Sequence, residues 1–248
     1  MALREELERQ GNWLFRYRSY LPLLGIPILI LALRKSEYME RNFGHAVEEF
    51  WGFFSICISF LGLGIRCAVA GYVPRGTSGK NTKSQVAETL NSTGMYSIVR
   101  NPLYLGNFVI NLGMILFIEV WWLALIVLCG FWFYYERIIL AEEEFLRKKF
   151  GSAFSEWAAK TPVFFPNFAK WERPGLPFSF KTVLRREFST FFSIIATFTF
   201  LGIAADIFAE GKFELGLAWA VLFITGLVIY LTLRILKKRT HKLDVPGR

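Results

Sequence analysis

Residues that could bind an anion gather at one sharp transition in the sequence, between Gly94 and Gly106. Here a polar stretch runs into an apolar one through Arg100, Asn101 and Pro102. Asn followed by Pro is typical of a helix start, because an Asn side chain caps free N–H groups and Pro tolerates the first helical position. Free N–H groups and the positive end of the helix dipole attract anions, and Arg100 adds a fixed positive charge.

Two further residues extend this corner into the helix. Tyr104 follows about one turn after the expected start, so we expect its ring to face the same pocket. Gly106 has no side chain, so a ligand or a second helix can approach closely. The segment therefore predicts a ligand-binding corner at one end of an apolar helix.

The composition places this corner in a membrane protein. Hydrophobic residues make up 54% of the 248 residues and aromatic residues 17%, with 26 Phe, more than one soluble core can bury. The net charge of +9 could suggest nucleic acid, but the basic residues lie between apolar stretches, where membrane topology and anionic lipid headgroups explain them. We expect no nucleic-acid partner. With two His and three unpaired Cys in the chain, we also expect no metal site.

The expected fold is an all-α integral membrane protein with about six transmembrane helices. Residues 1–18 are charged with interspersed apolar residues, which predicts an interfacial helix. We divide the rest into residues 19–89 (two membrane helices and a polar loop), 90–166 (the core), 167–187 (a connector) and 188–248 (a closing hairpin and basic tail). The expected spans are roughly 20–33, 50–72, 102–118, 121–135, 188–208 and 213–235.

The charge distribution predicts the orientation. Of the 29 Lys and Arg residues, 25 fall on the side of the expected bundle that holds both termini and both long polar loops. The positive-inside rule therefore places both termini and the Gly94–Gly106 corner in the cytosol. A bacterial inner membrane and an endoplasmic reticulum would give the same bias.

Two blocks of residues together resemble the isoprenylcysteine carboxyl methyltransferase and phospholipid methyltransferase superfamily. The resemblance covers roughly residues 90–166, with a helical hairpin between the blocks. The first block is Gly94-x-Tyr96-x-x-x-Arg100-x-Pro102-x-Tyr104-x-Gly106, and the second is Glu142-Glu143-x-x-Leu146-x-x-x-Phe150-Gly151, followed by Phe154, Trp157, Thr161, Pro162 and Pro166.

The resemblance implies an enzyme that holds S-adenosylmethionine at the cytosolic face and methylates a lipid reached from within the bilayer. Its cofactor-binding residues would be Tyr96, Arg100, Asn101, Pro102, Tyr104 and Gly106, with Glu142 and Glu143 closing the pocket. The family usually has His where this chain has Asn101, and often another His where it has Thr93. A histidine base at these two positions is therefore excluded.

Methyl transfer from a sulfonium is an in-line displacement, so the protein must align the reactants and exclude water. An anionic acceptor needs a cation to orient it, and Arg100, Arg137 and the Lys80/Lys83 loop are candidates. An amine acceptor needs a carboxylate to take its proton, and Glu142, Glu143 and Glu144 are candidates. We expect Arg100, Arg137 and Glu143 to act in catalysis. The basic loops favour an anionic acceptor, while prenylated cysteine, a lipid phosphate and an amine headgroup all remain open.

Other interpretations compete with this one. An NADPH-dependent membrane sterol or lipid reductase has a similar architecture, and a channel or transporter is a third class. We expect Glu144 to be solvated, Arg66 to snorkel from its apolar span to the interface, and Tyr134 and Tyr135 to belong to an aromatic belt. The oligomeric state is not indicated.

Overall fold

The computed structural model describes residues 3–18, 20–34, 42–74, 76, 87–209, 211, 213 and 215–248. Every regular element in these ranges is a helix, so the all-α expectation is confirmed there. The elements are α1 (Leu3–Tyr17), η1 (Leu21–Gly25), α2 (Ile26–Leu33), α4 (His45–Tyr72), α5 (Met95–Ile98), α6 (Pro102–Leu116), α7 (Trp121–Phe150), α8 (Ser152–Lys160), η2 (Phe168–Lys170), α9 (Phe180–Ala209) and α10 (Leu217–Arg239).

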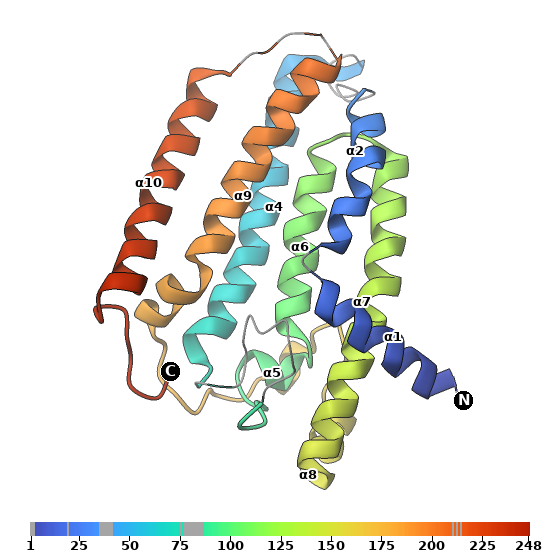
Figure 1. The fold of residues 1–248 in the computed structure, drawn as a ribbon, viewed down its shortest axis with the longest axis vertical. Coiled ribbons are helices and arrows are strands. Elements are labelled where there is room, and N and C mark those ends of the chain that lie inside the picture. Colours follow the sequence, from blue (N-terminus) through green and yellow to red (C-terminus); the bar gives the residue numbers. More distant parts are fainter. Residues whose placement is uncertain are drawn as a thin grey trace.

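Four helices, α4, α7, α9 and α10, are long and apolar enough to cross a membrane. Two shorter apolar helices, Leu23–Leu33 and α6, lie beside them. This fits a membrane protein, while six crossings and cytosolic termini stay predictions. Both termini lie at the lower end of the molecule in Figure 1, where α1, α5 and α8 also gather.

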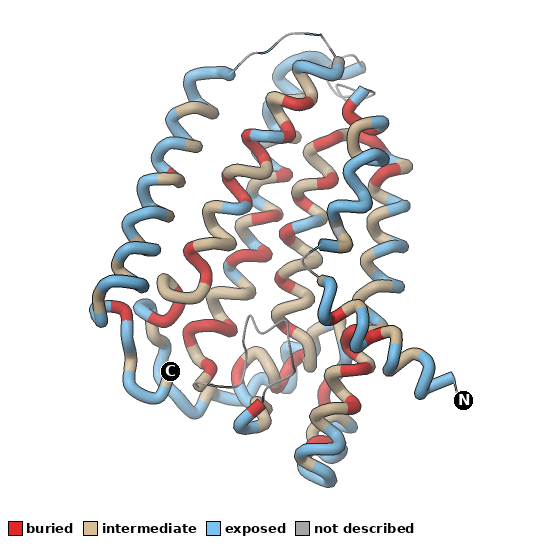
Figure 2. The backbone as a smooth tube through the Cα atoms, in the orientation of Figure 1, coloured by how far each residue is buried: buried red, intermediate tan, exposed pale blue. Residues whose placement is uncertain are grey.

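The long helices run side by side in the order α10, α9, α4, α6 and α7, with α2 packed near α7 (Figure 1). The buried residues lie on their facing sides, and α10 consists mostly of exposed residues with intermediate ones between them (Figure 2). The exposed side chains of α10 are largely apolar, as expected for a lipid-facing helix. The two core clusters join α2, α6, α7 and α9 around Leu201 and α4, α6 and α9 around Phe198.

Small residues bring α4 and α6 into close contact. A Cβ atom added at Gly62 would lie 2.6 Å from the Ile110 nitrogen, and one at Gly113 would lie 2.3 Å from the Ser59 hydroxyl oxygen. The Ser59 hydroxyl donates a hydrogen bond to the Ile110 carbonyl at 2.8 Å. Such small-residue interfaces are the usual way for membrane helices to approach closely. A Cβ atom added at Gly64, two residues further along α4, would by contrast meet nothing within 4 Å.

The hairpin between α6 and α7 has the expected tight turn, with Glu119 in the left-handed region at φ 64°. The second helix is longer than the apolar span of residues 121–135 suggests, because α7 continues to Phe150. Residues 136–150 are rich in Glu, Leu, Ala, Lys and Arg, which favour helix outside the apolar region. This extension carries Glu142 and Glu143 back toward the start of α6.

The close approach of α4 and α6 yields a stability prediction. Gly62→Ala should lower the melting temperature in detergent, because the new methyl group overlaps the backbone of α6, an overpacking that costs about 1–3 kcal/mol. Gly64→Ala, two residues along the same helix, is the matched control and should leave the melting temperature unchanged or slightly higher. Equal melting temperatures for both variants would contradict the packing described here.

Candidate functional site

A cavity of about 660 Å³ opens at the end of the bundle where α5 lies. Its volume falls within the range of small-molecule and cofactor sites. Its lining includes residues of α1 and of each α-helix from α4 to α10, together with positions 18, 76, 87, 89–91, 100 and 101 between the helices. Six of the residues expected to form the site line it: Tyr96, Arg100, Asn101, Pro102, Tyr104 and Glu142.

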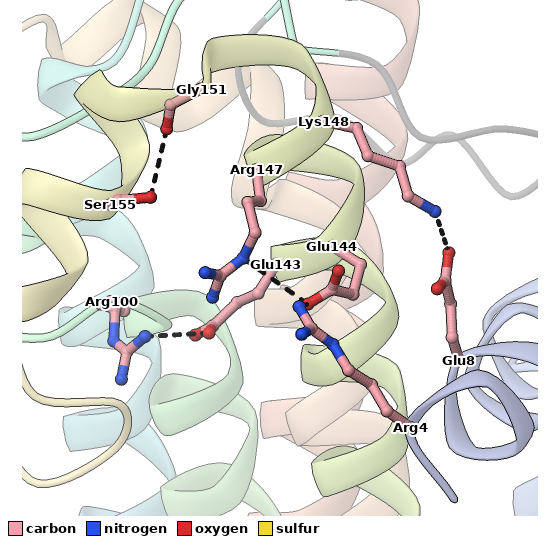
Figure 3. Close-up of polar contacts among 9 residues, drawn as sticks. All are labelled: Arg4, Glu8, Arg100, Glu143, Glu144, Arg147, Lys148, Gly151 and Ser155. Atoms are coloured by element: carbon pink, nitrogen blue, oxygen red, sulfur yellow. Dashed lines mark hydrogen bonds and ion pairs between the residues drawn. The ribbon is translucent and has the colours of Figure 1, made fainter. Parts of the chain in front are cut away.

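Arg100 and Glu143 join the two sequence blocks. The Arg100 guanidinium donates from Nη1 to Glu143 Oε2 at 2.8 Å (Figure 3). Both side chains are mostly buried, with 16% and 17% exposed. Arg100 Nε and Glu143 Oε1 are buried without a hydrogen-bond partner in the described part of the chain. One donor and one acceptor are thus left for a ligand, since buried polar groups rarely stay unsatisfied.

A second bond joins the same two blocks one turn further along α6. The Tyr104 hydroxyl donates to Glu142 Oε1 at 2.8 Å. The Tyr104 ring packs against Tyr135, with centroids 4.8 Å apart. Two consecutive carboxylates on α7 therefore bind Arg100, just before the start of α6, and Tyr104, in its first turn. Glu142 lies in the cavity wall, and Glu143 lies behind Arg100.

The segment after α8 holds the start of α6 in place through backbone hydrogen bonds. The Arg100 N–H donates to the Pro162 carbonyl at 2.8 Å, and the Asn167 N–H donates to the Ile98 carbonyl at 2.9 Å. The helix start at Pro102 is confirmed, but the side-chain cap expected of Asn101 is wrong. Its amide Nδ2 instead donates to the Val163 carbonyl at 3.2 Å, because this segment passes beside the helix start.

Tyr96 lies in α5, just before the start of α6. Its carbonyl accepts a hydrogen bond from Trp157 Nε1 at 3.0 Å, and its side chain lines the cavity. Burial and, second, the negative charge of Glu142 raise the pKa of the Tyr96 phenol. The phenol therefore stays protonated near neutral pH and can donate a hydrogen bond.

Arg66 is a cavity residue that the sequence analysis assigned elsewhere. It does not snorkel to the interface: its Nε and Nη2 donate to the two Glu187 carboxylate oxygens at 2.8 and 3.0 Å, and its Nη1 donates to Asn107 Oδ1 at 2.7 Å. Only 12% of the Arg66 side chain and 7% of the Glu187 side chain are exposed. A charged residue within an apolar span indicates a buried partner, so the sequence could have shown that Arg66 has one, although not that it is Glu187.

Tyr134 and Tyr135 were assigned to an aromatic belt, but both line the cavity. Tyr135 stacks on Phe131 with centroids 4.1 Å apart, and the Tyr134 hydroxyl is buried without a partner among the described residues.

Three of the expected site residues are not among the described residues that line the cavity: Glu143, which lies behind Arg100, and Gly106 and Arg137. Gly106 faces α4, where an added Cβ would lie 2.6 Å from Arg66 Cγ, so its missing side chain makes room for Arg66. Arg137 faces α1: its Nε donates to Gln10 Oε1 at 2.9 Å and its Nη1 to the Phe133 carbonyl at 2.8 Å. A catalytic role for Arg137 stays a prediction without support from this placement. Lys80 and Lys83 lie outside the described residues.

Glu144 is buried, contrary to expectation, with 7% exposed. It binds Arg4 of α1, and its Oε1 lies 3.6 Å from Arg147 Nε (Figure 3). Lys148 binds Glu8 at 2.6 Å on the same interface (Figure 3). The sequence pattern of α7 could not reveal this burial, because it depends on the docking of α1.

Comparison with known proteins identifies a family pattern in the same part of the chain. The family model described as phospholipid methyltransferase matches residues 54–153, beginning in α4 and ending at the start of α8. The match thus starts earlier and stops earlier than the resemblance over residues 90–166.

Two curated relatives are similar to part of the chain. The nickel-cobalt-cadmium resistance protein NccN of Alcaligenes xylosoxydans xylosoxydans is 39% identical over 75 residues, which cover 30% of this chain and 35% of NccN. The cobalt-zinc-cadmium resistance protein CzcN of Cupriavidus metallidurans is 36% identical over 78 residues, which cover 32% of this chain and 36% of CzcN. The matched segment thus spans about a third of each relative's length. No solved structure matches the chain.

The segment matched by the family model contains most of the cavity wall, including the Arg100–Glu143 and Tyr104–Glu142 bonds. The resemblance found in the sequence is therefore confirmed: residues 54–153 carry the phospholipid methyltransferase family pattern, which is part of the isoprenylcysteine/phospholipid methyltransferase superfamily and indicates a membrane methyltransferase.

Proposed function

We propose that the protein is an S-adenosylmethionine-dependent methyltransferase that modifies a lipid or lipidated acceptor at the cytosolic face of its membrane. The observation that carries this proposal is the meeting of the two family blocks at one cavity. There Arg100 binds Glu143, and Tyr104 binds Glu142. The family match to residues 54–153 supports the reaction class.

The residues at the cavity fit S-adenosylmethionine. This cofactor, when bound, supplies an electrophilic methyl group on a sulfonium. The Glu142 and Glu143 carboxylates can accept hydrogen bonds from its hydroxyl or amino groups, and Arg100 can donate to its carboxylate. The rings of Tyr96 and Tyr104 offer faces that favour a cation.

Apolar side chains in the lining, among them Val69, Ile138 and Leu146, would help to exclude water from the acceptor. An anionic acceptor needs no base, which suits a cavity without a histidine. The charge bias of the chain supports a cytosolic cavity, as the positive-inside rule expects.

Metal resistance, which appears in the names of the two relatives, forms no part of this proposal. Among the described residues there is no group of three or more His, Cys, Asp or Glu side chains that could hold a metal ion.

The first test is calorimetric titration of the detergent-purified protein with S-adenosylhomocysteine and, separately, with NADPH. S-adenosylhomocysteine should bind. Arg100→Ala and Glu143→Ala should each weaken its affinity at least about tenfold, or about 1.4 kcal/mol, because each leaves a buried charge without its partner.

The matched control is Glu136→Ala, which removes an exposed carboxylate from the same helix. This variant should bind S-adenosylhomocysteine within about twofold of the unmodified protein, a change of under 0.5 kcal/mol. Binding of NADPH alone would assign the protein to the reductases, and binding of neither compound would refute the proposal.

A second test addresses Glu142. Tyr104→Phe removes the hydroxyl that donates to this buried carboxylate and should weaken S-adenosylhomocysteine binding about tenfold, since a hydrogen bond to a charged group contributes about 1.5–3 kcal/mol. Tyr230→Phe is the control, because its hydroxyl accepts from Arg234 on α10 at 3.0 Å, away from the cavity. If Tyr104→Phe binds as tightly as the control, Glu142 is not part of the cofactor site.

A further inference from the structure

One wall of the cavity comes from a part of the chain that the family match does not cover. Arg186 and Glu187 lie near the start of α9, and Lys237 lies in the last turn of α10. All three line the cavity, although residues 54–153 mark the limits of the family pattern. Helix α9 begins at Phe180, eight residues before the apolar stretch, and this extension places Arg186 and Glu187 at the cavity.

The described cavity lining carries more positive than negative charge. Its cationic side chains are Arg18, Arg66, Arg100, Arg186 and Lys237, and its carboxylates are Glu142 and Glu187.

The carboxylates in and behind the wall are engaged elsewhere. Glu187 binds Arg66 through both oxygens, and Glu143 binds Arg100. Glu142 accepts from Tyr104. The α9–α10 side of the cavity thus carries two cations, Arg186 and Lys237, and one carboxylate, Glu187, whose two oxygens both bind Arg66.

The cations on this side lie close enough to act on one another. The charges of Arg185, Arg186 and Lys238 all act on Lys237. Asp244 binds Arg185 at 3.1 Å, on the side of the C-terminal tail. Like charges gathered where water is partly excluded repel each other strongly, and a bound anion relieves that repulsion.

Lys237 is held toward α9 by packing as well as by charge. Its Nζ lies 5.2 Å from the centre of the Phe188 ring, and Phe188 directly follows the cavity residue Glu187 on α9. The Arg186 side chain is half-buried, and its Nη2 donates at 3.5 Å to the Pro74 carbonyl, a neutral group. Two cations from two helices thus flank one side of the cavity.

We infer that Arg186 and Lys237 form a binding site for the anionic oxygen group, a phosphate or a carboxylate, of the lipid acceptor. This inference rests on the proposed function, because it places the acceptor in the cavity that would hold the cofactor. Both helices that carry the pair are long and apolar enough to cross a membrane. Exposed apolar side chains such as Ile224 and Val228 continue along α10, so acyl chains can lie against the hairpin while the headgroup reaches the two cations.

The competing explanation is that the basic end of α10 only anchors the helix at the membrane interface. Lys238 and Arg239 suit that role, because they are exposed and are not among the described residues that line the cavity. Lys237 and Lys238 are both exposed lysines in the last turn of α10, but Lys237 is among the described residues that line the cavity and Lys238 is not. The two neighbours therefore separate a specific site from general attraction.

The test is calorimetric titration of the full chain in neutral maltoside micelles with dihexanoyl phosphatidic acid. Lys237→Gln and Arg186→Gln should each weaken binding about tenfold, because each removes one cation from the site. Lys238→Gln should change binding less than about twofold, because both cations of the site remain. Lys237→Arg should retain binding. The melting temperature of each variant checks that it is folded. If Arg186→Gln does not fold, Lys237→Gln still tests the site, because Lys237 is exposed and its replacement should not disturb folding.

Two further probes identify the source of the anion. Dihexanoylglycerol lacks the phosphate and should not bind, and inorganic phosphate should bind at least about tenfold more weakly than the lipid. Equal binding of inorganic phosphate would overturn the headgroup assignment in favour of a free anion. Equal effects of Lys237→Gln and Lys238→Gln, or no effect of either, would overturn the site itself.

A parallel titration with S-adenosylhomocysteine separates this inference from the proposed function. If phosphatidic acid binds through Lys237 but S-adenosylhomocysteine does not bind at all, the anion site stands and its role in methyl transfer is refuted. If S-adenosylhomocysteine binds and phosphatidic acid does not, the proposed function stands and this inference is refuted.

Discussion

A charge inside an apolar helical bundle must find a partner, and the pairing of Arg66 with Glu187 is the interaction on which the site depends. It joins α4 to α9 through two hydrogen bonds, and Asn107 adds α6 at the same point. Removing one partner of such a buried pair typically costs about 3–5 kcal/mol, because the other charge is left unsatisfied. Three helices are therefore held together at the cavity wall by a single guanidinium.

This pairing requires a close fit between α4 and α6. The stem of Arg66 passes over Gly106, where any side chain would collide with it. Gly62, one turn earlier on α4, meets the backbone of α6 in the same way. The absence of a side chain at Gly106 therefore makes room for the Arg66 side chain and not for a ligand. Gly106 affects the site indirectly, because the space beside it determines where Arg66 and its partners lie.

The local features of the site could be predicted from the sequence, while its long-range features could not. Asn-Pro identifies a helix start, and the apolar hairpin brings the acidic residues of the second block back toward the first, so the start at Pro102 could be located. The Arg66–Glu187 pair spans 121 residues along the chain, and no local pattern connects its members. The burial of Glu144 depends on α1, which docks from the other end of the sequence.

The positions of residues at the ends of apolar spans were also difficult to predict, because their residue types suggest the membrane interface. Three residues of types common at membrane interfaces line the cavity instead: Arg66, Tyr134 and Tyr135. The composition of a membrane interface and that of a polar cavity just inside it are alike, because both combine aromatic rings with cations. Which side of the helix faces the protein decides between them, and that depends on how the neighbouring helices pack.

The family segment alone does not enclose the cavity. Residues 54–153 supply Arg100, Tyr104 and Glu142, but Phe15 and Arg18 come from the N-terminal part and Arg186 and Lys237 from the C-terminal hairpin. The reaction of a family resides in its site, while neighbouring elements can change around it. In this chain the shared segment provides the wall with paired acidic residues, and the flanking helices provide the cation-rich wall. The acceptor would then be selected by the parts of the chain that the family does not share, with the methyl-transfer site left intact.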